Sequence, residues 1–492
     1  MAYTICFLSA IAVLLLFLVY GLMHVSDTDS YFNCDRQLRW FEFGNSFAAA
    51  STSLATVLFF FVTLGLTNGL YILISPISFY IGTTLFNKLM LPRLKKQHYC
   101  VSKDNEKTIG VTLGEYIKVR YNSKLVKYVI MTITLLGIVA IMLIELFVGV
   151  TIFDIFLKPE YEEYALYFIA IVSFVYTGMG GLNAVVKTDK WQFWFMMVVA
   201  LMLIVFMFFS YSNTVDSKQF FPTFLGDTGV LKQNWALYLN IITVNALLVP
   251  SLLRNWQLIA AAERDMDIKK GFINGVFMTA LISLLFVIFG IQFFTVFSDA
   301  PLSMNGILST MAESSSSFMS CLLFPLLFTA CLMALLSTVD SSLLPVVQCI
   351  ACDFFPNSKK GQEKKRYLFC MIITLIITLF LYKVVFKWLK FDIISWLFTI
   401  FGLVTISSPA ILFACFGRDS VLRTRSMQIS TIVCTILGLV VAMTISIIGN
   451  NSSGESNLSI IQLNTPIAIS ITSVLLGLVY FVIHFSVKKK SL

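Results

Sequence analysis

Among the apolar stretches of this sequence, the richest group of polar side chains lies between residues 334 and 342. Ser337, Asp340 and Ser341 recur at i, i+3 and i+4, so a helix would place all three on one face. Thr338 stands beside them, and hydroxyl and carboxylate oxygens are the hard donors that small cations require. Isolated hydroxyls more often bond back to their own helix, but this density of polar groups favours a cation site.

A second group runs from Tyr176 to Gln192 and combines glycines with an acid. The glycines predict an interruption of one helix, and Asp189 is expected to start the next. Thr188 or Asp189 would then accept hydrogen bonds from free backbone N–H groups at the helix start. Such capping alone would explain the pair, although Asp189 could cap the helix and still face a cavity.

A third feature is the run of small residues from Ala48 to Thr56. Small residues let helices approach each other closely, which is one explanation of the run. The run also suits a helix that unwinds and exposes carbonyl oxygens to an ion. No Gly or Pro marks such a break, so the sequence leaves both explanations open.

Two further charged residues lie within apolar stretches. Arg254 follows Pro250, and it either extends its charge toward water or contacts a substrate or a gate. Glu145 is either an internal salt-bridge partner or a gate residue, and the sequence does not choose between them.

The composition indicates which elements must position these residues. Hydrophobic residues make up 58% of the 492-residue chain, charged residues make up 12%, and the mean hydropathy is +0.87. A soluble domain carries about 25% charged residues, so this composition excludes a water-soluble enzyme or a nucleic-acid-binding protein. A membrane helix needs about 20 apolar residues. Thirteen stretches of the sequence qualify: 4–23, 45–66, 68–91, 125–149, 164–180, 190–212, 236–258, 271–297, 319–353, 367–387, 391–416, 428–449 and 465–486.

The distribution of positive charge predicts how the chain is oriented. If the N-terminus lies outside, most of the 35 Lys and Arg residues fall in the loops between spans that lie on the cytoplasmic side of the membrane. Because positive residues favour the cytoplasmic side, the tail 487–492 is expected in the cytoplasm and the protein in the plasma or inner membrane. Asn451 and Asn457 begin N-x-S sequons in an outer loop, and residues 112–118 predict a short interfacial helix.

Two of these groups follow a known pattern. Residues 176–192 have the form Y-T-x-x-G-G-x-x-A-V-x-x-T-D-x-x-Q, and Met333 to Ser341 read M-A-L-L-S-T-V-D-S. Both resemble signatures of the sodium:solute symporter family. Weaker similarities extend the resemblance over roughly residues 4–416, and they lie at 30–38, 112–121, 256–261 and 408–410.

The resemblance implies an all-α polytopic membrane protein of the LeuT type, with about thirteen transmembrane helices. In such folds two inverted five-helix repeats hold substrate and ions at broken helices near the membrane midplane. The implied parts are an extra N-terminal helix (1–24), the first repeat (45–212), the second repeat (236–416), two additional helices (428–486) and the tail (487–492).

The resemblance also implies site residues. The sodium site would comprise Ala49, Thr52, Ala334, Ser337 and Thr338. A second ion site would comprise Asp189, Ser337, Asp340 and Ser341. Substrate would contact Ser53, with Asn245 and Ser251 as further candidates. Leu252 and Leu253 stand where sugar-transporting members have polar side chains, which argues against a sugar.

The implied function is sodium-coupled symport of a small polar organic solute into the cell by alternating access. Two alternatives stay open: a proton-coupled transporter of the same fold, using Asp189 and Asp340, and a membrane solute sensor with a separate signalling partner. The three His residues are scattered, so we expect no enzyme and no cofactor, with Na+ as the coupling ion. The expected partners are the solute, Na+ and the lipid bilayer, without nucleic acid. The sequence specifies neither the solute, the ion stoichiometry nor the oligomeric state.

Overall fold

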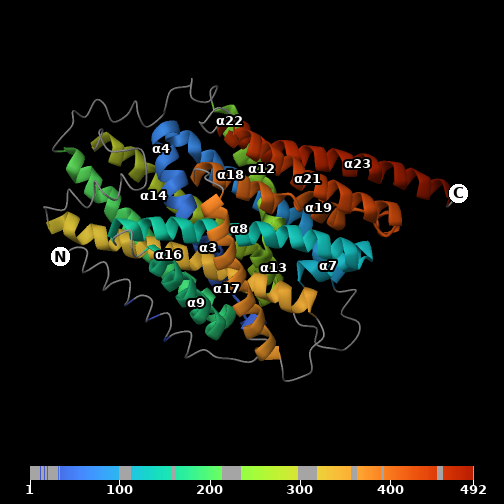
Figure 1. Cartoon of the computed structure of the whole chain (residues 1–492), viewed down its shortest axis with the longest axis horizontal. Coiled ribbons are helices and arrows are strands. Elements are labelled where there is room, and N and C mark those ends of the chain that lie inside the picture. The colour runs from blue at the N-terminus through green and yellow to red at the C-terminus, as the bar shows by residue number, and fades with distance from the viewer. Residues whose placement is uncertain are drawn as a thin grey trace. The chain divides into compact units, whose positions relative to one another are not determined.

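The computed structural model describes residues 31–32, 34–98, 112–156, 162–212, 234–296, 318–355, 363–388, 393–451 and 458–490, together with positions 12, 16 and 19. Every regular element in these ranges is a helix (Figure 1). The first expected span, 4–23, lies outside the described residues apart from those three positions, as does the sequon at Asn457.

The first half of the chain contains η1 (Cys34–Arg36), α3 (Trp40–Ser51), η2 (Ala55–Val62), α4 (Thr63–Asn68), η3 (Gly69–Leu73), α5 (Ile74–Leu85), η4 (Phe86–Met90), α6 (Leu91–His98), α7 (Leu113–Tyr121), α8 (Lys124–Phe156) and α9 (Glu162–Ser212). The second half contains α12 (Trp235–Ser251), α13 (Leu253–Ala261), α14 (Asp265–Val296), α16 (Phe318–Cys349), η7 (Ile350–Phe354), α17 (Glu363–Trp388), α18 (Ile393–Thr405), α19 (Ser408–Phe416), α20 (Asp419–Leu422), α21 (Arg425–Asn451), α22 (Leu458–Gln462) and α23 (Asn464–Lys490).

Within the described residues, nine helical stretches are long and apolar enough to cross a membrane, and the bent pair α12–α13 makes ten. One stretch, Leu166–Phe208, has 43 residues and covers the two expected spans 164–180 and 190–212. At 1.5 Å per residue it would measure about 65 Å, twice the hydrocarbon thickness, if it were straight. The expected span 45–66 corresponds to α3, η2 and α4. Every expected span after the first therefore has a helical counterpart.

The chain divides into two compact units, and the first comprises Met1–Ile77, Met142–Asn234 and Glu263–Leu344. In this unit α3 packs against α14 and α9. Phe43 and Phe47 of α3 meet Phe272 of α14 edge to face, with ring centroids 4.9 and 5.3 Å apart. This geometry is the favoured one for aromatic pairs, so it fixes the broken-helix segment against its neighbour.

The second unit comprises Ser78–Ile141, Trp235–Ala262 and Pro345–Leu492. Here α21 and α23 run side by side (Figure 1). Ile133, Ile406, Ala442 and Ala468 form a buried apolar cluster between the helices of this unit.

The helix that carries the run of small residues is interrupted at Thr52. This residue has φ −101° and ψ 65°, which is outside the helical region, and a π-helix begins at Ala55. The hydroxyls of Ser51 and Thr52 donate to the carbonyls of Phe47 and Ala48 at 2.7 and 2.8 Å. The Thr52 bond satisfies the Ala48 carbonyl, which lacks a backbone donor because the Thr52 N–H bonds to Ala49 instead, so the chain unwinds here without Gly or Pro.

A second break separates α12 from α13, which are bent by 46°. Pro250 contributes to this break because it lacks a backbone N–H and crowds the preceding turn. Two side chains of α13 satisfy the carbonyls at the end of α12. Asn255 Nδ2 donates to Val249 at 2.8 Å, and Trp256 Nε1 donates to Pro250 at 2.9 Å.

The third break, at Gly181, lies inside α9. Its backbone has φ 61° and ψ −164°, a region open essentially to glycine alone. A Cβ at this position would lie 2.6 Å from the carbonyl oxygen of Tyr31. The hydroxyl of Tyr31 donates to the carbonyl of Gly178 at 3.1 Å, so Tyr31 contacts the chain both at the break and one turn before it.

The expectation that Thr188 or Asp189 caps the following helix is wrong. Helical structure resumes directly after Gly181, so both residues lie more than one turn inside the helix. The hydroxyl of Thr188 donates to the carbonyls of Ala184 and Val185 at 3.0 and 2.9 Å instead of accepting from N–H groups. Asp189 therefore has a role other than capping this helix.

Candidate ion and solute site

The carboxylate of Asp189 lies at the meeting point of three helices in the first unit. Ser46 of α3 donates to its Oδ2 at 2.5 Å, and Ser337 of α16 donates to its Oδ1 at 2.7 Å. All three side chains are buried, and Asp189 and Ser337 are 0% exposed. Hydrogen bonds to an ionised acceptor are about twice as strong as neutral ones. Asp189 therefore ties the first half of the broken helix to the polar face of α16.

Asp340 forms a second buried acidic group on the same face of α16. Tyr176 donates to Asp340 Oδ2 at 2.6 Å, and the Tyr176 and Thr188 hydroxyls lie 2.7 Å apart. Asp340 is 0% exposed, and its Oδ1 has no hydrogen-bond partner among the described residues. A buried carboxylate oxygen without a donor is costly, so this atom is available to a cation or a proton.

The hydroxyls of α16 divide between their own helix and its neighbours. Thr338 donates to the Ala334 carbonyl at 3.1 Å, and Ser341 donates to the Thr338 carbonyl at 3.3 Å. The Ser337 hydroxyl instead donates to Asp189 of α9, and the Asp340 carboxylate accepts from Tyr176 of α9. The oxygens of Thr338 and Ser341 still have lone pairs to offer a cation, because each donates its only proton to the helix.

On α3, the predicted sodium ligands Ala49 and Thr52 lie at the end of the first half-helix. Both are buried, and the Thr52 N–H donates to the Ala49 carbonyl at 3.0 Å. Ala49 follows Ser46 by one turn, so the two lie on the same face of α3. The face of α3 that meets Asp189 thus continues to the helix end, where carbonyls lack helical partners.

Ser53, the predicted substrate contact, lies in the break itself and is 7% exposed. Its hydroxyl is 2.9 Å from that of Thr56 and accepts the Thr56 N–H at 3.1 Å. Thr56 in turn donates to the Ser53 carbonyl at 3.1 Å. Ser53 therefore caps the start of the second half-helix and presents a pair of hydroxyls there.

Glu145 of α8 lies at the same helix start. Its Oε2 accepts the N–H of Leu54 at 3.0 Å and its Oε1 accepts that of Ala55 at 3.3 Å. The side chain is 1% exposed, and no Lys or Arg within the described ranges forms an ion pair with it. The sequence allows Glu145 to be a salt-bridge partner or a gate residue. Within the described ranges it forms no salt bridge, and its carboxylate caps the second half of the broken helix.

The other two candidate substrate contacts lie on α12 in the second unit. Asn245 is half-buried and donates to the Ser78 hydroxyl at 3.2 Å. Ser251 is fully buried, and its hydroxyl lies 2.5 Å from that of Ser408, which also donates to the Leu247 carbonyl at 2.8 Å. Ser251 thus secures the broken end of α12 to the start of α19.

Residues of the motif at 112–121 take part in a separate polar cluster in the second unit. Thr112 accepts the Glu115 N–H at 3.1 Å, as an N-cap, and donates to Asp353 Oδ1 at 2.8 Å. Lys127 Nζ pairs with the same Asp353 oxygen at 2.9 Å and with Glu115 at 3.5 Å. A Cβ on Gly114 would collide with the Asp353 carboxylate, so glycine is required for this approach.

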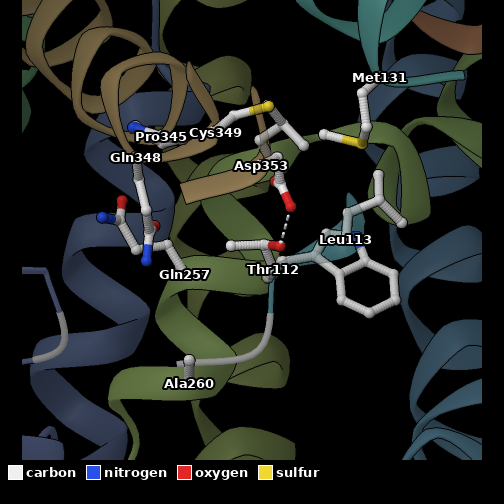
Figure 2. A pocket seen from close by; sticks show the side chains of 11 residues that line it. Thr112, Leu113, Met131, Gln257, Ala260, Pro345, Gln348, Cys349 and Asp353 are labelled. Atoms are coloured by element: carbon white, nitrogen blue, oxygen red, sulfur yellow. Dashed lines mark hydrogen bonds between the residues drawn. The ribbon is translucent and has the colours of Figure 1, made fainter. Parts of the chain in front are cut away.

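This cluster borders a cavity of about 20 Å³ (Figure 2). Gln257 and Gln348 face it from one side and Asp353 from the other. Gln257 Nε2 and Asp353 Oδ2 have no hydrogen-bond partner within the described ranges. The volume suffices for one water molecule, which could accept from the amide and donate to the carboxylate.

The rest of α7, the expected interfacial helix, binds the end of α19. Arg120 donates to the carbonyls of Ala414 and Gly417 at 2.6 and 2.7 Å and pairs with Asp419. The Tyr116 hydroxyl also donates to Ala414, at 3.3 Å. Burial raises the pKa of the Tyr116 hydroxyl, so it stays protonated and keeps this role as a donor.

Three contacts of the site were not expected from the sequence. The sequence indicates no role for Ser46, places Tyr176 only within a motif, and allows Glu145 to be either a salt-bridge partner or a gate residue. A partial signal existed for Ser46, because it lies one turn before Ala49 in the run of small residues. Nothing in the local pattern indicated which helix each of these side chains would meet.

The sequence matches the family described as the Sodium:solute symporter family over residues 31–417, well over half of the chain. The chain therefore belongs to the sodium:solute symporter family of membrane transporters, as the motifs indicated, and it is not an enzyme. No curated protein matches it in sequence.

Solved structures of other transporters share its fold. One is a Na+-coupled sialic acid symporter in a substrate-bound outward-open state, at 15% identity and a TM-score of 0.71, covering 96% of this chain and 98% of that one. Another is a mutant manganese transporter of Eremococcus coleocola, at 14% identity and a TM-score of 0.55, covering 95% and 97%. These similarities establish the LeuT-type multi-span fold.

Proposed function

We propose that this transporter is a symporter in which a sodium gradient drives uptake of a small polar organic solute. The observation that carries the proposal is the buried carboxylate of Asp189, which holds Ser46 of the broken helix and Ser337 of α16. A buried acid joined to hydroxyls on two helices suits a site whose occupancy by a cation changes how those helices are held.

In this proposal the main sodium ion binds at the end of α3 and on α16. Its ligands are the carbonyls of Ala49, Thr52 and Ala334 and the hydroxyls of Ser337 and Thr338. A helix C-terminus carries partial negative charge, which favours a cation at the carbonyl end of the break. Sodium there joins the broken helix to α16 and favours the outward-open state. Solute then binds beside Ser53, and inward opening releases both.

A second ion is proposed at Asp189, Ser337, Asp340 and Ser341. Asp340 Oδ1, which has no partner among the described residues, supports this assignment. Even one ion supplies a sufficient driving force. A charge crossing about 100 mV contributes about 2.3 kcal/mol, and a tenfold sodium gradient adds about 1.4 kcal/mol. Together they support about 500-fold accumulation of a neutral solute.

The proposal includes the repeats at 45–212 and 236–416. Each would begin with a broken helix, since the first breaks at Thr52 and the second between α12 and α13. The positive residues support an outside N-terminus and a cytoplasmic C-terminus in the cell membrane. The polar cluster at Asp353 and Lys127 would then lie toward the cytoplasm.

A thermal-shift panel on the purified protein tests this function. Sodium, potassium and lithium are each combined with sugars, sialic acid, amino acids, amines, carboxylates and vitamins. We expect a solute to stabilise the protein only when sodium is present, because sodium orders the broken helix. Uptake into proteoliposomes with and without a sodium gradient then measures coupling. Solute stabilisation equal in all three cations would contradict sodium coupling.

One observation also favours the rival function, proton coupling. Asp340 and Asp189 are both 0% exposed, and Tyr176 already donates to Asp340. Buried acids on neighbouring membrane helices are the groups that proton relays use. Proton coupling would show as solute stabilisation that depends on pH and is indifferent to sodium, in the same panel.

A further inference from the structure

The break in the α3–η2 segment has two chemically different ends. The end of α3 presents backbone carbonyls to the break, whereas the start of η2 presents N–H groups. Two of these N–H groups, those of Leu54 and Ala55, are bonded to the carboxylate oxygens of Glu145 at 3.0 and 3.3 Å. One side chain from α8 thus occupies two adjacent donors of the second half-helix.

Backbone donors at the start of a half-helix form an anion site, because the N–H groups and the helix dipole both attract negative charge. In transporters of this fold such half-helix starts point at anionic groups of the substrate. Here the chain's own carboxylate fills that position. An anionic group of a solute would therefore meet these donors already bonded to Glu145.

The surroundings of the Glu145 carboxyl group hold further hydrogen-bond acceptors. The side chain of Glu145 is 1% exposed, and no Lys or Arg among the described residues pairs with it. The neighbouring hydroxyls of Ser53 and Thr56 can accept further hydrogen bonds. This end of the break is therefore suited to a group that donates hydrogen bonds.

We propose that Glu145 determines solute specificity by filling the anion position of the broken helix, so that the solute presents an ammonium or hydroxyl group there and not a carboxylate. This inference rests on the proposed function for the existence of a solute site. The occupation of the N–H groups by Glu145 can be tested without any solute.

The first experiment is chemical rescue of Glu145→Ala. Removal of the carboxylate leaves the Leu54 and Ala55 N–H groups without an acceptor in a pocket of matching size. We expect formate to raise the melting temperature of E145A toward that of the wild type, relative to chloride at equal ionic strength. The wild type should not respond. Asp267→Ala is the matched control, because Asp267 accepts the Trp40 N–H at 3.1 Å at the start of another helix. It should show no comparable rescue.

The second experiment measures selection between solutes of similar shape. Amino sugars are compared with sugar acids, and amino alcohols with hydroxy acids, by thermal shift in sodium. We expect the wild type to bind only the amine or neutral member of each pair. E145A should gain affinity for the carboxylate member by about tenfold or more, since two charge-assisted hydrogen bonds become available. D267A should keep the wild-type preference.

The outcomes separate this inference from the proposed function. Formate rescue of E145A supports the anion position even if no solute in the panel binds. The absence of solute binding would count against the proposed function alone. Equal responses of E145A, D267A and the wild type to formate would overturn the inference. If E145A does not fold, Glu145→Gln replaces it, and an unchanged preference for amines in E145Q would also overturn the inference.

Discussion

Ser337 donates a hydrogen bond of 2.7 Å to Asp189, although the two residues are 148 positions apart in the sequence. The other carboxylate oxygen of Asp189 accepts from Ser46, which is 143 positions away in the opposite direction. A single acid thus brings together the broken first helix, the helix after Gly181 and the polar face of α16. Any ion that binds at Asp189 competes with or adds to these two bonds, and this couples ion binding to the position of α3.

We expect Asp189→Asn to weaken the second ion site selectively. The amide keeps one acceptor for a serine hydroxyl but removes the negative charge that holds a cation. The sodium concentration that gives half-maximal stabilisation should rise by at least about tenfold, and the Hill coefficient should fall from near two toward one. Asp267→Asn is the control, because Asp267 is another buried acid that accepts the Trp40 N–H and is not among the proposed ligands, so its sodium curve should stay close to that of the wild type. A D189N curve identical to the wild type would exclude Asp189 as a ligand.

Tyr176→Phe should destabilise the protein more than Tyr116→Phe. Tyr176 donates to the buried carboxylate of Asp340, whereas Tyr116 donates to the neutral carbonyl of Ala414. Loss of a bond to a charged group costs about 1.5–3 kcal/mol, against about 0.5–1.5 kcal/mol for a neutral bond. Unfolding in detergent measures both, and equal losses would indicate that Asp340 is uncharged in the resting protein.

Gly181→Ala and Gly477→Ala should have opposite effects on stability. The first places a Cβ on a backbone with φ 61° and against the Tyr31 carbonyl, which costs about 1–3 kcal/mol. The second lies in helix α23 with no atom within 4 Å of its added Cβ. Alanine there should stabilise the helix by about 0.5–1 kcal/mol. A neutral G181A would show that the break does not need its positive φ.

The ion pair of Lys127 and Asp353 should behave as a coupled unit. Their side chains are 5% and 0% exposed, and Nζ lies 2.9 Å from Oδ1. Lys127→Ala leaves the Asp353 charge buried without its cation, at a cost of about 3–5 kcal/mol. The double variant K127A/D353A should lose much less than the sum of the single variants. Additive losses would mean that the two groups do not interact.

The polar face of α16 illustrates what the sequence could predict. The spacing of Ser337, Asp340 and Ser341 placed them on one helical face because the helical period depends only on local geometry. The pattern could not identify Ser46 and Tyr176 as their partners, since those contacts join segments far apart in the chain. It also could not show which hydroxyls bond to their own helix, as Thr338 does, and which reach a neighbouring helix.

The region after Gly181 shows where local signals were misleading. A Thr-Asp pair before an apolar run is typical of a helix start, but the helix resumes some six residues earlier. The strained backbone at Gly181 ends one helix and lets the next begin at once, so no side-chain cap is required. Glu145 similarly carried no local signal, because its partners are backbone N–H groups that only the break in another helix makes available.

The most direct test of the sodium site is equilibrium binding of radioactive sodium to the purified protein. We expect the wild type to bind sodium saturably and the double variant S337A/T338A to lose the main site. Thr279→Ala is the matched control, because its buried hydroxyl also bonds back to its own helix, in α14, and it should bind like the wild type. Undiminished sodium binding by S337A/T338A would contradict the assignment of this site.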